Sequence, residues 1–215
     1  HADDMELGCG GYMHRHATVG AQTLNLIVAL GDVYFEHLGR LVTSGERFAE
    51  AAEAAQRLRV GSVEVMFADK DGKLDTLPMG DIVQALDRHI AEFEPTEILI
   101  PLPSSHQDHT ILYQACLAAT RPSAKRPVQL IAAYEYPATS WGPGGESDAG
   151  KGGMYVGLSE GDISAKTDAL RCYRSQMRDG HCFSVEAALA LAKIRGIECG
   201  LPRAELFHVM RRLVP

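Results

Sequence analysis

Two short clusters of histidine and acidic residues hold the side chains best suited to chemistry in this chain. The first is His1-Ala2-Asp3-Asp4, and the second is Ser105-His106-Gln107-Asp108-His109-Thr110. A zinc ion that performs hydrolysis takes about three nitrogen and oxygen ligands from the protein and leaves one position for water. The two clusters contain enough imidazoles and carboxylates for such a ligand set, with a base and an acid left over.

Alternating apolar and amphipathic segments indicate the elements that position these clusters. Short runs rich in Val, Ile and Leu predict strands at 23–30, 62–67, 97–102 and 128–133. Helices are predicted between and after these strands, at 9–19, 45–58, 79–93, 108–120, 162–177 and 184–195. Apolar strands separated by helices are typical of a mostly parallel sheet between helix layers. We therefore expect an α/β fold, specifically a Rossmann-like three-layer α/β/α sandwich, with a glycine-rich loop at 142–154.

This expected fold gives the two clusters equivalent places. The first predicted helix should follow a strand, and we expect that strand to be missing from the numbered chain, so that residues 1–4 lie at its carboxyl end. The second cluster comes directly after the predicted strand at 97–102. In open parallel sheets, ligands bind in the crevice outside the carboxyl ends of the strands. The two clusters are therefore expected to face each other across one crevice.

Composition restricts the class of protein. A chain of 215 residues with 46% hydrophobic content predicts a single domain, residues 1–215, with one ample core. The formal net charge of −7 argues against nucleic acid as a partner. The apolar runs are too short to span a membrane. The five cysteines are odd in number and form no Cys-x-x-Cys pair, which indicates a reducing compartment, so we expect a cytoplasmic protein.

The residues around the two clusters form longer motifs. The first cluster opens the run His-Ala-Asp-Asp-Met-Glu-Leu-Gly-Cys-Gly-Gly, and the second contains His-Gln-Asp-His. These runs resemble the His-Pro-Asp-Asp-Glu-x-x-Gly-Cys-Gly-Gly and His-Pro-Asp-His signatures of the PIG-L/LmbE-like metal-dependent N-deacetylases. The likeness continues in order along nearly the whole chain, through Arg47, the segment 170–176, Arg195-Gly196 and the segment 204–207.

Carried over residue by residue, the resemblance implies a metal site and a catalytic set. The implied zinc ligands are His1, Asp4 and His109. Asp3 matches the general base of the family, and His106 matches the residue that stabilises the oxyanion or acts as general acid. Asp108 matches the carboxylate that orients His106.

Three of these assignments have simpler alternatives. Asp3 and Asp108 could each cap the helix that follows, because carboxylates are favoured at helix N-termini. Arg47 matches an arginine with which the family contacts its sugar substrate, or it pairs with Glu46 or Glu50 on a solvated helix face.

The resemblance implies a zinc-dependent hydrolase that removes the acetyl group from an N-acetylated amino sugar or its conjugate, by means of metal-activated water and the Asp3 base. Another divalent transition metal could take the place of zinc. One alternative is an amidase that cleaves a larger amino-sugar conjugate, and a second is a metal-binding protein without turnover. The expected partner is a small sugar, and association into a homo-oligomer is also expected.

Overall fold

The computed structural model describes residues 1–122, 128–139 and 153–214. The chain divides into two compact units. The first unit contains His1–Asp71, Tyr136–Ala138 and Tyr155–Glu205, and the second contains Gly72–Glu135, Thr139–Met154 and Leu206–Pro215. Each unit is described by itself. The expectation of a single domain over residues 1–215 stays a prediction.

In the first unit, a parallel strand pair carries the helices. Strands β1 (Leu24–Leu30) and β4 (Ser62–Ala68) pair in parallel, with Leu24 opposite Ser62 and Leu30 opposite Ala68. The connection between them holds a small antiparallel hairpin, β2 (Val33–Phe35) and β3 (Arg40–Val42), and then helix α2 (Ser44–Arg57). Helix α1 (Asp4–Thr18) precedes β1, and helices α6 (Glu160–Leu170) and α7 (Val185–Cys199) come later in the chain.

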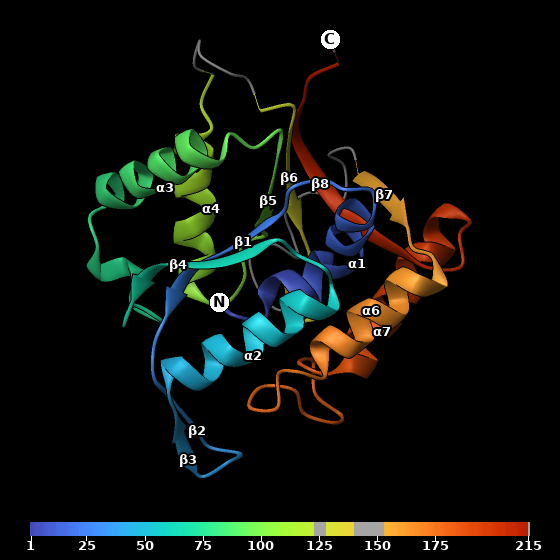
Figure 1. The fold of residues 1–215 in the computed structure, drawn as a ribbon, viewed down its shortest axis with the longest axis horizontal. Helices are drawn as coiled ribbons and strands as arrows, with labels where there is room; N and C mark the ends of the chain where they lie inside the picture. Colours follow the sequence, from blue (N-terminus) through green and yellow to red (C-terminus); the bar gives the residue numbers. More distant parts are fainter. Residues whose placement is uncertain (123–127, 140–152, 215) are drawn as a thin grey trace. The chain divides into compact units, whose positions relative to one another are not determined.

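Capping and burial explain why these helices form and where they pack. Helix α2 begins with a capping box between Thr43 and Glu46, and α6 begins with another between Ser159 and Asp162. Helix α6 packs against both α1 and α2, as Figure 1 shows. A buried cluster joins α1, α6 and α7 through Leu7, Leu170 and Ala188. The amino-terminal part of α1 is therefore buried in the core of its unit.

The second unit is built on a different sheet. Strands β5 (Glu97–Pro101) and β6 (Leu130–Tyr134) pair in parallel, and β6 pairs antiparallel with the second-unit part of β8 (Ala204–Arg212). All five residues of β6 are buried, as expected for a central strand. Helices α3 (Met79–Phe93) and α4 (Gln107–Ala119) pack against each other, and the short 3-10 helix η1 (Leu74–Thr76) contacts α4. Strand β7 (Gly153–Gly157) lies across the division between the units.

The structure confirms the predicted α/β class and the four predicted strands, with small differences at their ends. The pairs β1–β4 and β5–β6 are parallel as expected, whereas β8 is antiparallel and was not predicted. The predicted start of the first helix at residue 9 is wrong, because α1 begins at Asp4, although its backbone is non-helical at Cys9. The helix predicted to reach residue 177 ends at Leu170. Of the predicted loop at 142–154, only Gly153 and Met154 lie within the described residues, and both belong to β7.

Among the residues that the structure describes, no helix is both long enough and apolar enough to cross a membrane.

Gly196 tests how closely α7 packs against the chain that follows it. A Cβ atom at this position would lie 2.6 Å from the Leu201 carbonyl oxygen and 2.7 Å from the Arg203 main chain. These are backbone atoms that cannot move aside cheaply, so we expect Gly196→Ala to lower the free energy of unfolding by about 1–3 kcal/mol. Urea denaturation would measure the change.

The control is Gly80→Ala in helix α3, because a Cβ atom there meets nothing within 4 Å. Since alanine favours helix over glycine, this variant should be neutral or more stable by at most about 1 kcal/mol. Equal stability of the two variants would contradict the close approach at Gly196.

Candidate active site

The first cluster lies at the amino end of helix α1, where its polar groups are largely buried. Asp3 and Asp4 are each only 5% exposed. The Nδ1 atom of His1 lies 3.1 Å from the Oδ2 atom of Asp4. An imidazole nitrogen and a carboxylate oxygen thus converge on one point, and these are two of the donor types that zinc prefers.

Asp3 takes the N-cap position of α1, but its side chain makes no capping hydrogen bond. Burial raises the pKa of Asp3 to about 6, and the neighbouring Asp4 carboxylate adds to the rise, while His1 and Arg47 oppose it. A carboxyl group with a pKa in this range can both accept and return a proton near neutral pH. Asp3 therefore occupies the N-cap position of α1 without a side-chain cap, and its carboxyl group has a raised pKa.

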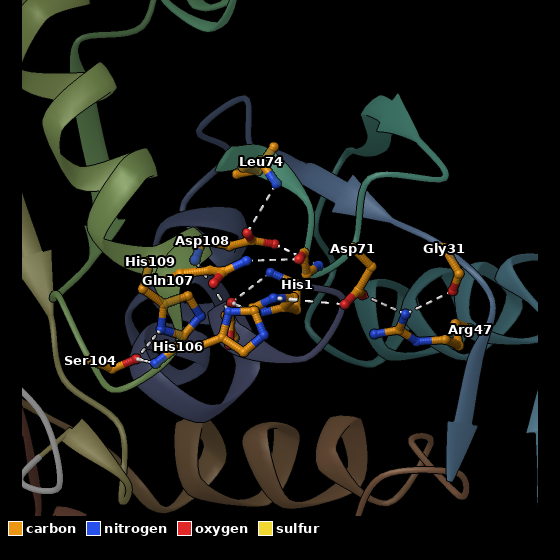
Figure 2. A network of polar contacts seen from close by, with 12 residues as sticks. His1, Gly31, Arg47, Asp71, Leu74, Ser104, His106, Gln107, Asp108 and His109 are labelled. Atoms are coloured by element: carbon orange, nitrogen blue, oxygen red, sulfur yellow. Dashed lines mark hydrogen bonds and ion pairs between the residues drawn. The ribbon is translucent and has the colours of Figure 1, made fainter. Parts of the chain in front are cut away.

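Arg47 supports the first cluster from helix α2. Its side chain is 3% exposed, and its Nη1 atom donates to the Gly31 carbonyl at 2.9 Å and to the Asp71 carboxylate. The other Asp71 oxygen, Oδ1, lies 3.9 Å from the Nε2 atom of His1. Figure 2 shows this row of His1, Asp71, Arg47 and Gly31. The partner of Arg47 is thus Asp71.

Glu46 and Glu50, the two partners considered for Arg47 from the sequence, are bonded elsewhere. Glu46 bonds to Arg40, and Glu50 bonds to Ser175. Asp71 was not identified from the sequence, because Asp-Lys-Asp-Gly after a strand predicts a turn and nothing more.

The second cluster lies in the second unit, where the loop after β5 enters helix α4. His106 is the N-cap residue of α4, and its Nδ1 atom accepts the Asp108 main-chain N–H at 3.3 Å. An accepting Nδ1 leaves the proton of the neutral ring on Nε2. His106 therefore presents an N–H donor from the far side of its ring.

His109 is 3% exposed and is fixed by Ser104. The Nδ1 atom of His109 lies 2.8 Å from the Ser104 hydroxyl oxygen, which also accepts the His106 main-chain N–H. Metal-binding histidines commonly bond one ring nitrogen to a second group and offer the other nitrogen to the metal, and Ser104 is placed to be this second group for His109. The His106 and His109 rings lie 5.6 Å apart, measured between their centres (Figure 2).

Asp108 anchors a turn of the second unit. Its carboxylate accepts the main-chain N–H groups of Gly72 at 2.7 Å and Leu74 at 3.1 Å. The neighbouring Gln107 side chain donates to the Gly72 carbonyl at 2.9 Å. His106, not Asp108, caps α4. The Asp108 main-chain N–H is thus one of the groups that orient the His106 ring.

The structure thus brings the predicted residues together in two groups. His1, Asp3, Asp4 and Arg47 belong to the first unit, and His106, Asp108 and His109 belong to the second. Each group is fixed by partners within its own unit.

Comparison with known proteins gives a consistent family. The model of the GlcNAc-PI de-N-acetylase (PIG-L) family matches residues 1–120. The curated protein YaiS of Escherichia coli strain K12, described as an uncharacterized deacetylase, is 27% identical over 146 residues, which is 65% of this chain and 71% of YaiS.

Solved structures share the fold. The conserved protein TT1542 of Thermus thermophilus matches with a TM-score of 0.77 and 25% identity, over 100% of this chain and 93% of its own. The N,N'-diacetylchitobiose deacetylase of Pyrococcus horikoshii matches with a TM-score of 0.74 and 20% identity, over 98% of this chain and 80% of its own. GalB of Pseudomonas putida KT2440, a 4-carboxy-2-hydroxymuconate hydratase, matches with a TM-score of 0.72 and 19% identity, over 100% of this chain and 95% of its own. The last two matches show the fold alone, and these two proteins are named for different reactions.

The ion pair of Arg47 and Asp71 yields a prediction about stability. Arg47→Met leaves the Asp71 carboxylate, only 11% exposed, without its cation. Breaking a buried pair by removing one partner costs about 3–5 kcal/mol, so we expect a loss of this order in the free energy of unfolding.

Arg40→Met provides the control, because Arg40 and its partner Glu46 are 51% and 46% exposed. Exposed pairs contribute less than about 1 kcal/mol. Urea titrations of both variants would measure the difference, and a loss at Arg47 no larger than the loss at Arg40 would contradict the buried pair.

Proposed function

Because the family model covers more than half of the chain, the protein belongs to the GlcNAc-PI de-N-acetylase family of deacetylases, and on this basis we propose that it is a zinc-dependent hydrolase that removes the acetyl group from an N-acetylated amino sugar. The observation that carries the proposal is the group at the start of α1. There, His1 Nδ1 and Asp4 Oδ2 converge beside a buried Asp3 whose pKa is raised to about 6.

We propose His1, Asp4 and His109 as the metal ligands. Among the described residues, these three form one of two candidate ligand sets of histidine and acidic side chains, and the other set is His1, His106 and Asp108. We favour the first set, because Asp108 already accepts two main-chain N–H groups and the His106 Nδ1 atom already accepts one. Two imidazoles and a carboxylate with an open position match the donor sets of hydrolytic zinc sites.

Three residues divide the remaining chemistry. Bound at these ligands, zinc supplies a Lewis acid that polarises the amide carbonyl and lowers the pKa of a water molecule. Asp3 takes the proton of the attacking water as general base. The Nε2–H group of His106 donates to the oxygen that gains negative charge. Asp108 is a positioning residue, since its main-chain N–H keeps the His106 proton on Nε2.

Asp3 or His106 then returns a proton to the leaving amine. Arg47 is proposed to contact the sugar. Its Nη1 atom is taken by Asp71 and Gly31, whereas its Nε atom has no hydrogen-bond partner in the described part of the chain. The chemistry expected there is that of a hydroxyl group, which could accept this N–H.

Other readings of the same site differ in their products. A larger amino-sugar amide would release a longer acid than acetate, and a hydration reaction, as named for GalB, would release no acid at all. A metal-binding protein without turnover would have no need of the Asp3 base. The cytoplasmic location and a homo-oligomer stay predictions.

The proposed function is tested by release of acetate from N-acetylglucosamine and its conjugates. We expect acetate release that stops after treatment with a chelator and returns with zinc. Asp3→Asn should slow the reaction by about 10²-fold or more, because general base catalysis is lost. Since Asp3 is proposed to touch water and not the metal, zinc content should stay at the wild-type level.

Acylated glucosamines of different chain lengths, followed by identification of the released acid, separate the alternatives. A longer acid released in preference to acetate would replace deacetylation by amidase activity, and product without any acid would favour hydration. Loss of zinc in Asp3→Asn would mean that Asp3 is the metal ligand and Asp4 the general base.

The ligand set makes a separate prediction about metal content. His109→Ala should remove most of the zinc, because it takes away one of three protein ligands. His14→Ala is the matched control, since the His14 side chain is bonded to Asp162 in the first unit and is not a proposed ligand. Elemental analysis of the purified variants would measure zinc per chain. Full zinc content in His109→Ala would refute the ligand set.

A further inference from the structure

Helix α1 is interrupted directly after the segment that carries the proposed metal ligand Asp4. Cys9 has φ −137° and ψ 20°, far from the helical values of about −63° and −42°. The helix therefore consists of two segments with different directions. At such a break, main-chain N–H and C=O groups lose their helical partners and need others.

A buried ion pair supplies these partners. The Lys166 Nζ atom donates to the Leu7 carbonyl at 3.0 Å. The Glu205 carboxylate accepts the N–H of Gly11 at 3.0 Å and of Tyr12 at 2.8 Å. Lys166 and Glu205 lie 2.6 Å apart, and their side chains are 2% and 3% exposed. The cation thus lies at the carboxyl end of the first segment and the anion at the amino end of the second, as the helix dipoles favour.

The pair occupies the place of one particular hydrogen bond. In an uninterrupted helix, the Gly11 N–H would donate to the Leu7 carbonyl, four residues earlier. Here the N–H donates to Glu205, and the carbonyl accepts from Lys166. The ion pair is therefore inserted between the two halves of this helical bond and holds them apart.

Gly11 makes room for the insertion. A Cβ atom at this position would lie 3.2 Å from the Glu205 Oε1 atom and 2.8 Å from the Leu158 side chain. Any larger residue would push the carboxylate away from the main chain. This close approach explains why glycine stands at position 11 of the motif.

We propose that Lys166 and Glu205 are positioning residues that maintain the break in α1 and thereby aim Asp3 and Asp4 at the metal. The inference rests on the proposed function, since it concerns the same metal site. Stability alone is a weak reason for the pair, because a buried ion pair replaced by apolar residues of similar volume is often equally stable. Without the pair, Gly11 and Leu7 can bond to each other, and the helix can close and turn its first segment.

The test is the double variant Lys166→Met/Glu205→Leu, studied without substrate. Zinc affinity would be measured by competition with a chromophoric chelator, and stability by thermal unfolding of the zinc-free protein. We expect an unfolding midpoint close to wild type and zinc affinity weakened by about 10–100-fold, the range seen when groups that support metal ligands are lost. Arg195→Met/Glu198→Leu, which removes a more exposed pair on α7, is the control and should keep its zinc affinity.

Hydrogen exchange of the Gly11 amide in the zinc-free protein reports on the break in α1. In the double variant the protection of this amide should change, because its N–H can then bond to the Leu7 carbonyl. If the double variant fails to fold, Glu205→Gln takes its place. It keeps the shape and loses the charge and one acceptor, so zinc affinity should fall while the protein stays folded.

Unchanged zinc affinity in either folded variant would overturn the inference. A wild-type protein that binds zinc but releases no acetate would contradict only the proposed function. A wild-type protein that binds no zinc would overturn both.

Discussion

The main constraint on the first unit is that its buried charges need partners. Asp4, Arg47, Lys166 and Glu205 are all less than 6% exposed, and an unpaired charge at such positions would be very costly. Arg47, Lys166 and Glu205 each have an opposite charge within hydrogen-bond distance, and the Oδ2 atom of Asp4 lies 3.1 Å from the His1 Nδ1 atom. The pairs run between elements: Arg47 joins α2 to the turn after β4, and Lys166 joins α6 to α1. The charges therefore fix the relative places of these elements, in addition to the apolar contacts around Leu7 and Leu170.

The second unit satisfies its polar residues by different means. Asp108 bonds to two main-chain N–H groups, and Ser104 lies between a main-chain N–H and the His109 ring. No Lys or Arg is needed in these contacts. Main-chain groups have fixed places in the fold, so they can orient an imidazole and select its tautomer without adding charge beside a metal. The two halves of the proposed site thus depend on side-chain charge in one unit and on main-chain geometry in the other.

The sequence was informative where one short segment carries the whole signal. The period of the apolar residues located β1, β4, β5 and the core of α3, and the resemblance of the two clusters to a family signature supplied the candidate ligands. Signals that depend on distant partners were missed. The role of Asp71 depends on Arg47, which lies 24 residues earlier in the sequence, and the residues of β8 show no regular alternation of apolar and polar side chains. The start of α1 was placed too late because glycines disfavour helix, and the first segment of α1, before the break at Cys9, is helical and buried all the same.

The ion pair in the break of α1 also has a consequence for the order of folding. The bond from Gly11 to Glu205 spans 194 residues, and the bond from Leu7 to Lys166 spans 159. The first cluster and the groups that hold its helix open are therefore far apart in the sequence. Contacts of such long range form late and slow the search for the native state. Residues 4–11 therefore reach their final form late in folding, and a chain that ends before residue 205 cannot form the Gly11–Glu205 bond that holds this helix open.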